Sequence, residues 1–184
     1  KAVMLATQSI RAGENNIVIA GGMENMSQAP HLIRGLRGQA VRFGANMKIE
    51  DSLFSNLLDP YCDFFMAQTS DNVAKKYGIS REAQDEYALR SHQEGVRAVK
   101  AGLFKEEIVP VTVKKRKQTM EVTADDHIKP DTSLEILSKL PTAFGKEGTV
   151  TAGNASGIVD GAACLVVTTG NRAREAGKKP IGRI

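Results

Sequence analysis

The two ends of the sequence predict an α/β fold. Residues 1–11 place apolar side chains on most sides of a helix, and the apolar run NIVIAGG follows at Asn16 to Gly22. Towards the other end, an apolar strand from Ala162 to Thr169 runs into a helical stretch that finishes near Ala176. Helices and strands that alternate in this way are typical of α/β architecture. The residues between the two ends differ in character, so we expect the chain to leave an α/β layer, make a long excursion and return.

The first helix and the apolar strands are predicted to be buried. The helix is expected to end near Gly13, and its apolar residues are too widely spread for a narrow stripe. The run from Asn16 to Gly22 is short, continuous and closed by two glycines, which is typical of a strand covered on both faces. By the same argument Cys164, inside the second apolar strand, is predicted to be a buried free thiol.

The excursion begins with an irregular stretch. Residues 28–59 show neither a helical nor a strand period, and arginines alternate with glycines between Arg34 and Gly44. So long a stretch of weak periodicity inside a compact chain is usually a functional loop or an assembly loop.

Two helices are predicted next, each with a clear stop signal. The first covers about residues 69–77 and ends at Gly78. The second covers about residues 81–101, with Ser80 as its N-cap and Gly102 after its last turn.

A hairpin and a short helix complete the excursion. EIVPVTVKKRKQTMEVTA alternates on both sides of a charged tip, which predicts a β-hairpin. The tip, Lys114 to Lys117, suggests a site that attracts the phosphates of a ligand, a nucleic-acid contact or a targeting signal. Basic and acidic residues are equally numerous over residues 105–131, however, so we expect a solvated turn. A short helix over residues 133–139 then leads through Pro141.

Composition narrows the class of protein. The 184 residues are 41% hydrophobic and 25% charged with a net charge of +4, which suits a globular protein with an anionic small-molecule partner. No window approaches the roughly 18 apolar residues of a membrane span, and no signal peptide is recognisable. The two cysteines fit no metal-binding spacing, so we expect no metal and a reducing, intracellular setting. The sequence opens inside a helical pattern without an initiator methionine, so we also expect a fragment.

The segment TVTAGNASGIVDGAACLVV, Thr149 to Val167, concentrates small residues in front of the second apolar strand. Small residues let a backbone approach a ligand or another backbone closely. Asn and Ser add short polar groups that can hydrogen-bond an amide-bearing ligand. Two interpretations stay open from the residues alone: the wall of a narrow ligand channel, or a tight turn packed against a helix.

Several strings in this sequence resemble the thiolases, the enzymes that make or cleave 3-ketoacyl-CoA. GTVTAGNASGIVDGAA resembles a thiolase signature, and LATQSIRAGENNIVIAGGMENMSQAPH resembles the segment after the nucleophile loop. DNVAKKYGISREAQDEYALRSHQ and KEEIVPVTV resemble parts of the thiolase loop domain. The resemblance covers essentially the whole chain and implies a duplicated, five-layered αβαβα fold with a loop domain inserted in the first half.

Carried over, the resemblance divides the chain into four parts. Residues 1–27 end the first thiolase half, and residues 28–157 form the loop domain, with tetramerisation and coenzyme A binding. Residues 158–178 return to the first half as a strand and a helix, and residues 179–184 begin the second half.

The resemblance also implies that the catalytic residues lie outside this chain. The nucleophilic cysteine is expected shortly before Lys1, and the histidine and second cysteine that handle protons beyond Ile184. The cysteines and histidines present here are not expected to form a nucleophilic pair. No metal or redox cofactor is required, because the coenzyme A thioester is itself the substrate.

Coenzyme A binding is the function that the resemblance assigns to this chain. Ser156 matches a serine that hydrogen-bonds the pantetheine arm, with Ala152 and Ala155 beside it as the channel wall. Met66 matches a methionine at the acyl end of the pocket. The preceding Phe65 stands where many short-chain thiolases have a histidine, which puts specificity for acetoacetyl-CoA in doubt.

Further candidates surround the adenine and pantetheine. Lys129 falls where an arginine commonly approaches the adenine nucleotide, and lysine keeps the charge but loses the planar group that stacks on adenine. Phe144 and Leu140 match apolar contacts to pantetheine or adenine, with core packing as the alternative. Ile136 stands where some members carry a polar residue. Tyr87 is a weak candidate from potassium-stimulated members, the other interpretation being a core tyrosine.

The resemblance therefore implies an acetyl-CoA C-acetyltransferase, which condenses two acetyl-CoA to acetoacetyl-CoA and coenzyme A or runs the reverse thiolysis through an acyl-cysteine. One alternative is a 3-ketoacyl-CoA thiolase of broader chain length in fatty-acid β-oxidation. Another is a non-catalytic thiolase-like protein that binds acyl-CoA or lipid. The stretch from Arg34 to Arg42 resembles a tetramerisation loop, so we expect a homotetramer, without nucleic-acid or membrane partners, in the cytoplasm or the mitochondrion.

Overall fold

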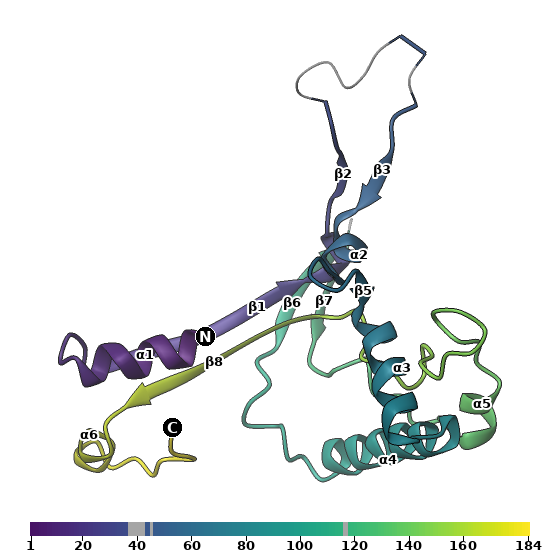
Figure 1. Ribbon diagram of the computed structural model, residues 1–184. Coiled ribbons are helices and arrows are strands. Elements are labelled where there is room, and N and C mark those ends of the chain that lie inside the picture. Colours follow the sequence, from purple (N-terminus) through teal and green to yellow (C-terminus); the bar gives the residue numbers. More distant parts are fainter. Residues whose placement is uncertain (37–42, 45, 116–117) are drawn as a thin grey trace. The chain divides into compact units, whose positions relative to one another are not determined.

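The computed structural model describes residues 1–36, 43–44, 46–115 and 118–184, which form two compact units (Figure 1). Unit 1 comprises Lys1–Ala29 and Ile158–Ile184, and unit 2 comprises Pro30–Gly157. The chain thus leaves unit 1, builds unit 2 and returns to unit 1.

Unit 1 is built around a long antiparallel ribbon of two strands. Its elements are α1 (Ala2–Arg11), β1 (Ile17–Asn25), the 3₁₀ turn η1 (Met26–Gln28), β8 (Asp160–Thr168) and α6 (Gly170–Glu175). β1 and β8 pair along their whole length, from Ile17 opposite Thr168 to Asn25 opposite Asp160 (Figure 1). The small core lies where α1 meets the ribbon and consists of Ala6, Ala20 and Val167, flanked by Val3, Ile10 and Val18. The helix ends where the sequence predicts, since Gly13 follows it with a φ of 75°.

The prediction that residues 16–22 form a strand covered on both faces is wrong. Ile19 is 73% exposed and Val166 is 70% exposed, while Ala20 and Val167, their neighbours along the strands, are buried. Cys164, predicted to be buried, is also exposed. One short helix shields only one face of a two-stranded ribbon, and only near one end. Period-2 alternation then leaves the other face open.

Within its described residues, unit 2 contains short strand pairs and four helices of 5 to 20 residues. Its elements are β2 (His31–Ile33), β3 (Ile49–Asp51), α2 (Ser52–Asn56), β4 (Leu58–Asp59), β5 (Phe64–Phe65), α3 (Met66–Tyr77), α4 (Arg81–Lys100), β6 (Val111–Lys115), β7 (Gln118–Val122) and α5 (Leu134–Ser138). The pairs β2–β3, β4–β5 and β6–β7 are all antiparallel.

Three helices of unit 2, α3, α4 and α5, and the hairpin β6–β7 agree with the sequence prediction. α3 ends at Gly78, whose φ of 66° is the left-handed conformation that glycine adopts without strain. The Ser80 hydroxyl accepts a hydrogen bond from the Ala83 amide and caps α4. Ser133 caps α5 in the same way. The signals at Gly78 and Ser80 therefore located their two helix ends correctly, whereas Ser133, predicted as the first residue of the short helix, is its N-cap.

The prediction of an irregular stretch over residues 28–59 is only partly right. Two short strand pairs and α2 form within or beside it, too short for a period to show in the sequence. Arg34 in this stretch donates through Nε to Glu50 at 2.6 Å. Most of the predicted tetramerisation loop (residues 37–42), and the end of the charged tip (residues 116–117), lie outside the described residues.

Candidate functional site

The small-residue segment folds as a fixed turn in unit 2. Thr151 pairs with Thr142 in an isolated β-bridge, and the Ala143 amide donates to the Val150 carbonyl at 2.8 Å. The Ala155 amide then donates to the Thr151 carbonyl at 3.0 Å, which closes one helical turn. Val150 and Thr151 are buried, so the turn is anchored at its beginning.

The Asn154 side chain locks this turn from inside. Its Nδ2 donates to the Thr149 carbonyl at 3.0 Å and to Asp85 Oδ1 at 2.9 Å. Its Oδ1 accepts from the Thr151 amide at 2.7 Å. The prediction that Asn154 hydrogen-bonds a ligand is wrong, because protein groups occupy both donors and the acceptor of its side chain.

Two aspartates on neighbouring helices hold the segment. Asp71 on α3 accepts through Oδ1 from the Thr149 amide at 2.7 Å, from its hydroxyl at 3.0 Å and from the Val150 amide at 3.2 Å. Asp85 on α4 is 3% exposed and also accepts from Arg81 Nε at 2.8 Å. The sequence analysis did not single out either aspartate, since each sits in a helix with no local sign of its distant partner.

Glycines let neighbouring groups reach the turn. A Cβ at Gly153 would overlap the side chains of Leu137 and Leu140, and one at Gly157 would overlap the ring of His127. Leu140 is therefore in contact with the turn, as a packing residue below it. Close approach, one of the two uses of small residues predicted from the sequence, is here made by the protein itself at these two positions.

The predicted wall residues lie on the outside of the turn. Ala152, Ala155 and Ser156 are all exposed, whereas Thr151, the residue before Ala152, is fully buried. The turn therefore offers two methyl groups and one hydroxyl to a ligand while its backbone stays fixed. The packed-turn interpretation is confirmed for the inner residues of the segment, whereas the ligand channel stays a prediction for its exposed small residues.

An aromatic cluster lies beside the predicted acyl end. The ring centroids of Phe65 and Phe144 are 5.1 Å apart, and those of Phe54 and Phe65 are 4.4 Å apart. Phe144 is half-buried. Met66, the next residue after Phe65, is 66% exposed and opens α3. Phe65 and Phe144 are thus brought together, and an apolar surface replaces the polar group that a histidine would supply.

Two histidines, His92 and His127, lie beside Lys129 and the end of the turn. Its amide donates to His92 Nδ1 at 3.2 Å, its Nζ donates to the Asp126 carbonyl at 2.8 Å, and its side chain is exposed. His127 lies against Gly157, next to Ser156. The structure therefore brings His127, two residues before Lys129, against the residue that follows Ser156.

Tyr87 and Ile136 lie away from the core. Tyr87 on α4 is 73% exposed, so its interpretation as a core tyrosine is wrong. The helix packs through the side that carries Asp85, and Tyr87 follows two residues later on another side. Ile136 is half exposed on α5.

The pKa of Asp160 is lowered; this aspartate lies in unit 1 and in the segment GTVTAGNASGIVDGAA. Ser27 donates to both oxygens of Asp160, from its amide at 2.9 Å and from its hydroxyl. These hydrogen bonds favour the charged form and lower the pKa of Asp160.

Within the described residues no group of three or more His, Cys, Asp or Glu side chains could hold a metal ion. No helix there is long and apolar enough to cross a membrane.

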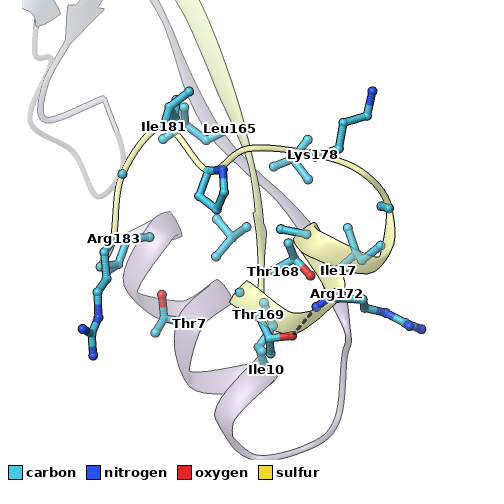
Figure 2. Close-up of a pocket in the computed structure, with 18 of the residues that line it drawn as sticks. Thr7, Ile10, Ile17, Leu165, Thr168, Thr169, Arg172, Lys178, Ile181 and Arg183 are labelled. Carbon is cyan, nitrogen blue, oxygen red and sulfur yellow. Dashed lines mark hydrogen bonds between the residues drawn. The ribbon is translucent and has the colours of Figure 1, made fainter.

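A cavity of about 1120 Å³ lies in unit 1 (Figure 2). α1, β8, α6 and residues 178–184 surround it, and Ile10, Ile17 and Leu165 give it an apolar lining. Arg172 and Arg183 extend outward from it (Figure 2). None of the predicted coenzyme A residues lines this cavity.

Comparison with known protein families decides the class of the chain. Residues 1–171 match the family described as thiolase, N-terminal domain. The chain belongs to the thiolase family. The resemblance on which the sequence analysis rests is thereby confirmed.

Individual relatives place the thiolase chain more closely. It is 46% identical over 182 residues to a "Probable acetyl-CoA acyltransferase" of Staphylococcus aureus (strain COL), covering 98% of this chain and 46% of the relative. It is 46% identical over 185 residues to an "Acetyl-CoA acetyltransferase" of Cupriavidus necator, covering 100% and 47%. The thiolase chain thus spans slightly less than half the length of these curated relatives.

Solved structures show the same fold. The crystal structure of human mitochondrial 3-ketoacyl-CoA thiolase superposes with a TM-score of 0.89 and 41% identity, over 97% of this chain and 45% of that one. The acetyl-CoA acetyltransferase of Bacillus anthracis gives a TM-score of 0.89 at 39% identity, over 97% and 45%. The mixed α/β architecture predicted from the sequence is therefore confirmed as the thiolase fold.

Proposed function

We propose that this chain supplies the coenzyme A-binding part of a complete thiolase. The complete protein would transfer an acetyl group between thioesters, condensing two acetyl-CoA to acetoacetyl-CoA and coenzyme A or running the reverse thiolysis. The acyl-cysteine intermediate of this reaction would form on a residue outside this 184-residue chain, and residues outside the chain would also carry out the proton transfers. Matching relatives named acetyl-CoA acyltransferase and acetyl-CoA acetyltransferase support the reaction class.

The exposed face of the turn carries this proposal. Pantetheine is a thin chain with two amide groups, and Ala152 and Ala155 leave it room to pass against the backbone. The Ser156 hydroxyl can donate to or accept from one of those amides. The anchored backbone of residues 149–155 keeps these groups in place before the ligand arrives, which lowers the entropy cost of binding.

Lys129 extends the proposed site towards the nucleotide. Its ammonium group is a hydrated point charge that can attract the phosphates of coenzyme A. Leu140 would act mainly from below the turn, through Gly153. Tyr87 remains a weak candidate, exposed and therefore accessible to a ligand. No metal or redox cofactor is part of the proposed reaction.

One observation favours a second candidate function. The cluster of Phe54, Phe65 and Phe144 beside the exposed Met66 provides apolar surface where a long acyl chain could lie. This supports a 3-ketoacyl-CoA thiolase of broader chain length, active in fatty-acid degradation. Thiolysis of acetoacetyl-CoA compared with a long-chain 3-ketoacyl-CoA, measured as kcat/KM, separates the two.

Assembly and compartment are part of the same proposal. We propose a homotetramer, supported by the resemblance of residues 34–42 to a tetramerisation loop. Cys62 and Cys164 are both free thiols, which suits a reducing compartment such as the cytoplasm or the mitochondrial matrix. Sedimentation of the complete protein tests the tetramer.

Thiolysis by the complete protein tests the proposed function. Acetoacetyl-CoA and coenzyme A are expected to yield acetyl-CoA with saturation in both substrates. Binding of coenzyme A without turnover would instead support the non-catalytic thiolase-like alternative. Absence of both binding and turnover would contradict the proposed thiolase and the non-catalytic alternative.

A further inference from the structure

Asp85 is a carboxylate in an unusual place. It is 3% exposed on α4, a helix whose other residues are less buried. Burying a carboxylate is costly unless hydrogen bonds replace its water. Here Oδ2 accepts from Arg81 and Oδ1 accepts from Asn154, so each oxygen has a partner from a different segment.

Arg81 fixes this carboxylate in position. While its Nε donates to Asp85, its Nη2 donates to the Leu137 carbonyl at 2.7 Å and to the Leu140 carbonyl at 3.2 Å. The guanidinium is planar and rigid, so these bonds set the direction of Nε. Arg81 thereby fixes the carboxylate of Asp85, on α4, relative to the end of α5.

Asn154 transfers this fixed position to the turn. Its amide bridges Asp85, the Thr149 carbonyl and the Thr151 amide, on both sides of the buried Val150. An Asp side chain at this position could accept from Thr151 but could not donate to Asp85. The chemistry therefore requires an amide, and the two donors have to point in two set directions.

Resting on the proposed function, we infer that Asp85 and Asn154 are positioning residues for coenzyme A. Neither shares the exposed face of the turn formed by Ala152, Ala155 and Ser156. They act through the backbone, by holding that face at the height and angle that pantetheine meets. Apolar residues of similar volume often stabilise a buried site as well as an ion pair does. The role of the polar network here is therefore to set the direction of the turn rather than to add stability.

The experiment replaces Asn154→Asp in the complete protein. This nearly isosteric change removes both donors and sets a carboxylate against Asp85. Asn72→Asp, which makes the same change at an exposed position on α3, is the matched control. We expect Asn154→Asp to raise the KM for coenzyme A in thiolysis about tenfold, with kcat at saturation changed less than about threefold. The control is expected to match the wild type.

A reciprocal exchange provides the rescue. In the double variant Asp85→Asn with Asn154→Asp, the amide at 85 donates to the carboxylate at 154, so their contact is restored with reversed polarity. We expect its KM for coenzyme A to lie between those of the wild type and Asn154→Asp. A KM as high as that of Asn154→Asp, or higher, would overturn the inference.

A merely structural role gives a different pattern. The melting temperature of Asn154→Asp would fall while its KM for coenzyme A stayed equal to that of Asn72→Asp, and this result also overturns the inference. Should Asn154→Asp fail to fold, Asn154→Ser is compared with Asn72→Ser under the same two criteria. Calorimetric titration of the wild type with coenzyme A separates the two claims: no binding there defeats the proposed function, whereas normal binding with unchanged variants defeats only the positioning role.

Discussion

At the scale of single residues, Gly153 has no room for a side chain. A Cβ there would overlap methyl groups of Leu137 and Leu140, and Leu137 is fully buried and cannot move aside. We predict that Gly153→Ala lowers the free energy of unfolding by about 1–3 kcal/mol, the usual cost of overpacking. Gly170→Ala is the control, because its Cβ would meet only Arg174 Nη1 at 3.5 Å. Equal melting temperatures of the two variants would contradict the packing described.

The pH response of Asp160 is a second property of one residue. Ser27 lowers the pKa of Asp160 below its ordinary value of 3.8, so the interaction stabilises the folded state above that value. This stability is lost as the pH falls through the lower pKa of the folded state. We predict that Ser27→Ala raises the pKa of Asp160 towards its ordinary value, measured by NMR titration of the carboxyl carbon. An unchanged pKa would show that the hydroxyl does not reach the carboxylate in solution.

At the scale of elements, α3 and the turn are joined through one carboxylate. Asp71 accepts from the amides of Thr149 and Val150, which protects both from exchange with water. We predict that Asp71→Ala accelerates hydrogen exchange at these two amides, while the amides within α3 remain protected. Asn72→Ala, one residue along the same helix, is expected to leave both rates unchanged. Slow exchange at both amides in Asp71→Ala would contradict the link.

Element boundaries were the part of the fold best predicted from sequence. Ser80, Gly78 and Ser133 act through groups within a few residues, so the sequence shows the signal and the response together. The strand pair β2–β3 was missed because strands of three residues have no readable period. The burial of β1 was predicted wrongly, because an apolar run reports which residues can be covered and says nothing of what covers them.

The site was predicted from resemblance more than from pattern. Ser156, Ala152 and Ala155 stand together in a short segment, and the structure puts all three on one exposed turn. Asp71 and Asp85 were missed because they lie 78 and 69 residues from the groups that they hold. Nothing in a helix of mixed charges distinguishes an aspartate that accepts from a distant backbone.

At the scale of the whole molecule, the ribbon in unit 1 carries an open apolar face. Ile17, Ile19, Met23 and Val166 are all exposed there. Apolar surface gathered on one element favours association. We predict that the 184 residues expressed alone self-associate, as measured by light scattering, and that Ile19→Lys with Val166→Lys reduces this. A monodisperse species of 19.8 kDa would contradict the prediction.

We propose that coenzyme A passes against the exposed face of the turn. Calorimetric titration of the complete protein with coenzyme A tests this directly, because it measures the affinity. Ala155→Leu fills that face without removing a hydrogen bond, and Ala83→Leu makes the same change on the exposed side of α4. We expect Ala155→Leu to weaken coenzyme A binding at least about tenfold, which is about 1.4 kcal/mol, and Ala83→Leu to bind like the wild type. Equal affinity in all three proteins would mean that coenzyme A does not pass there.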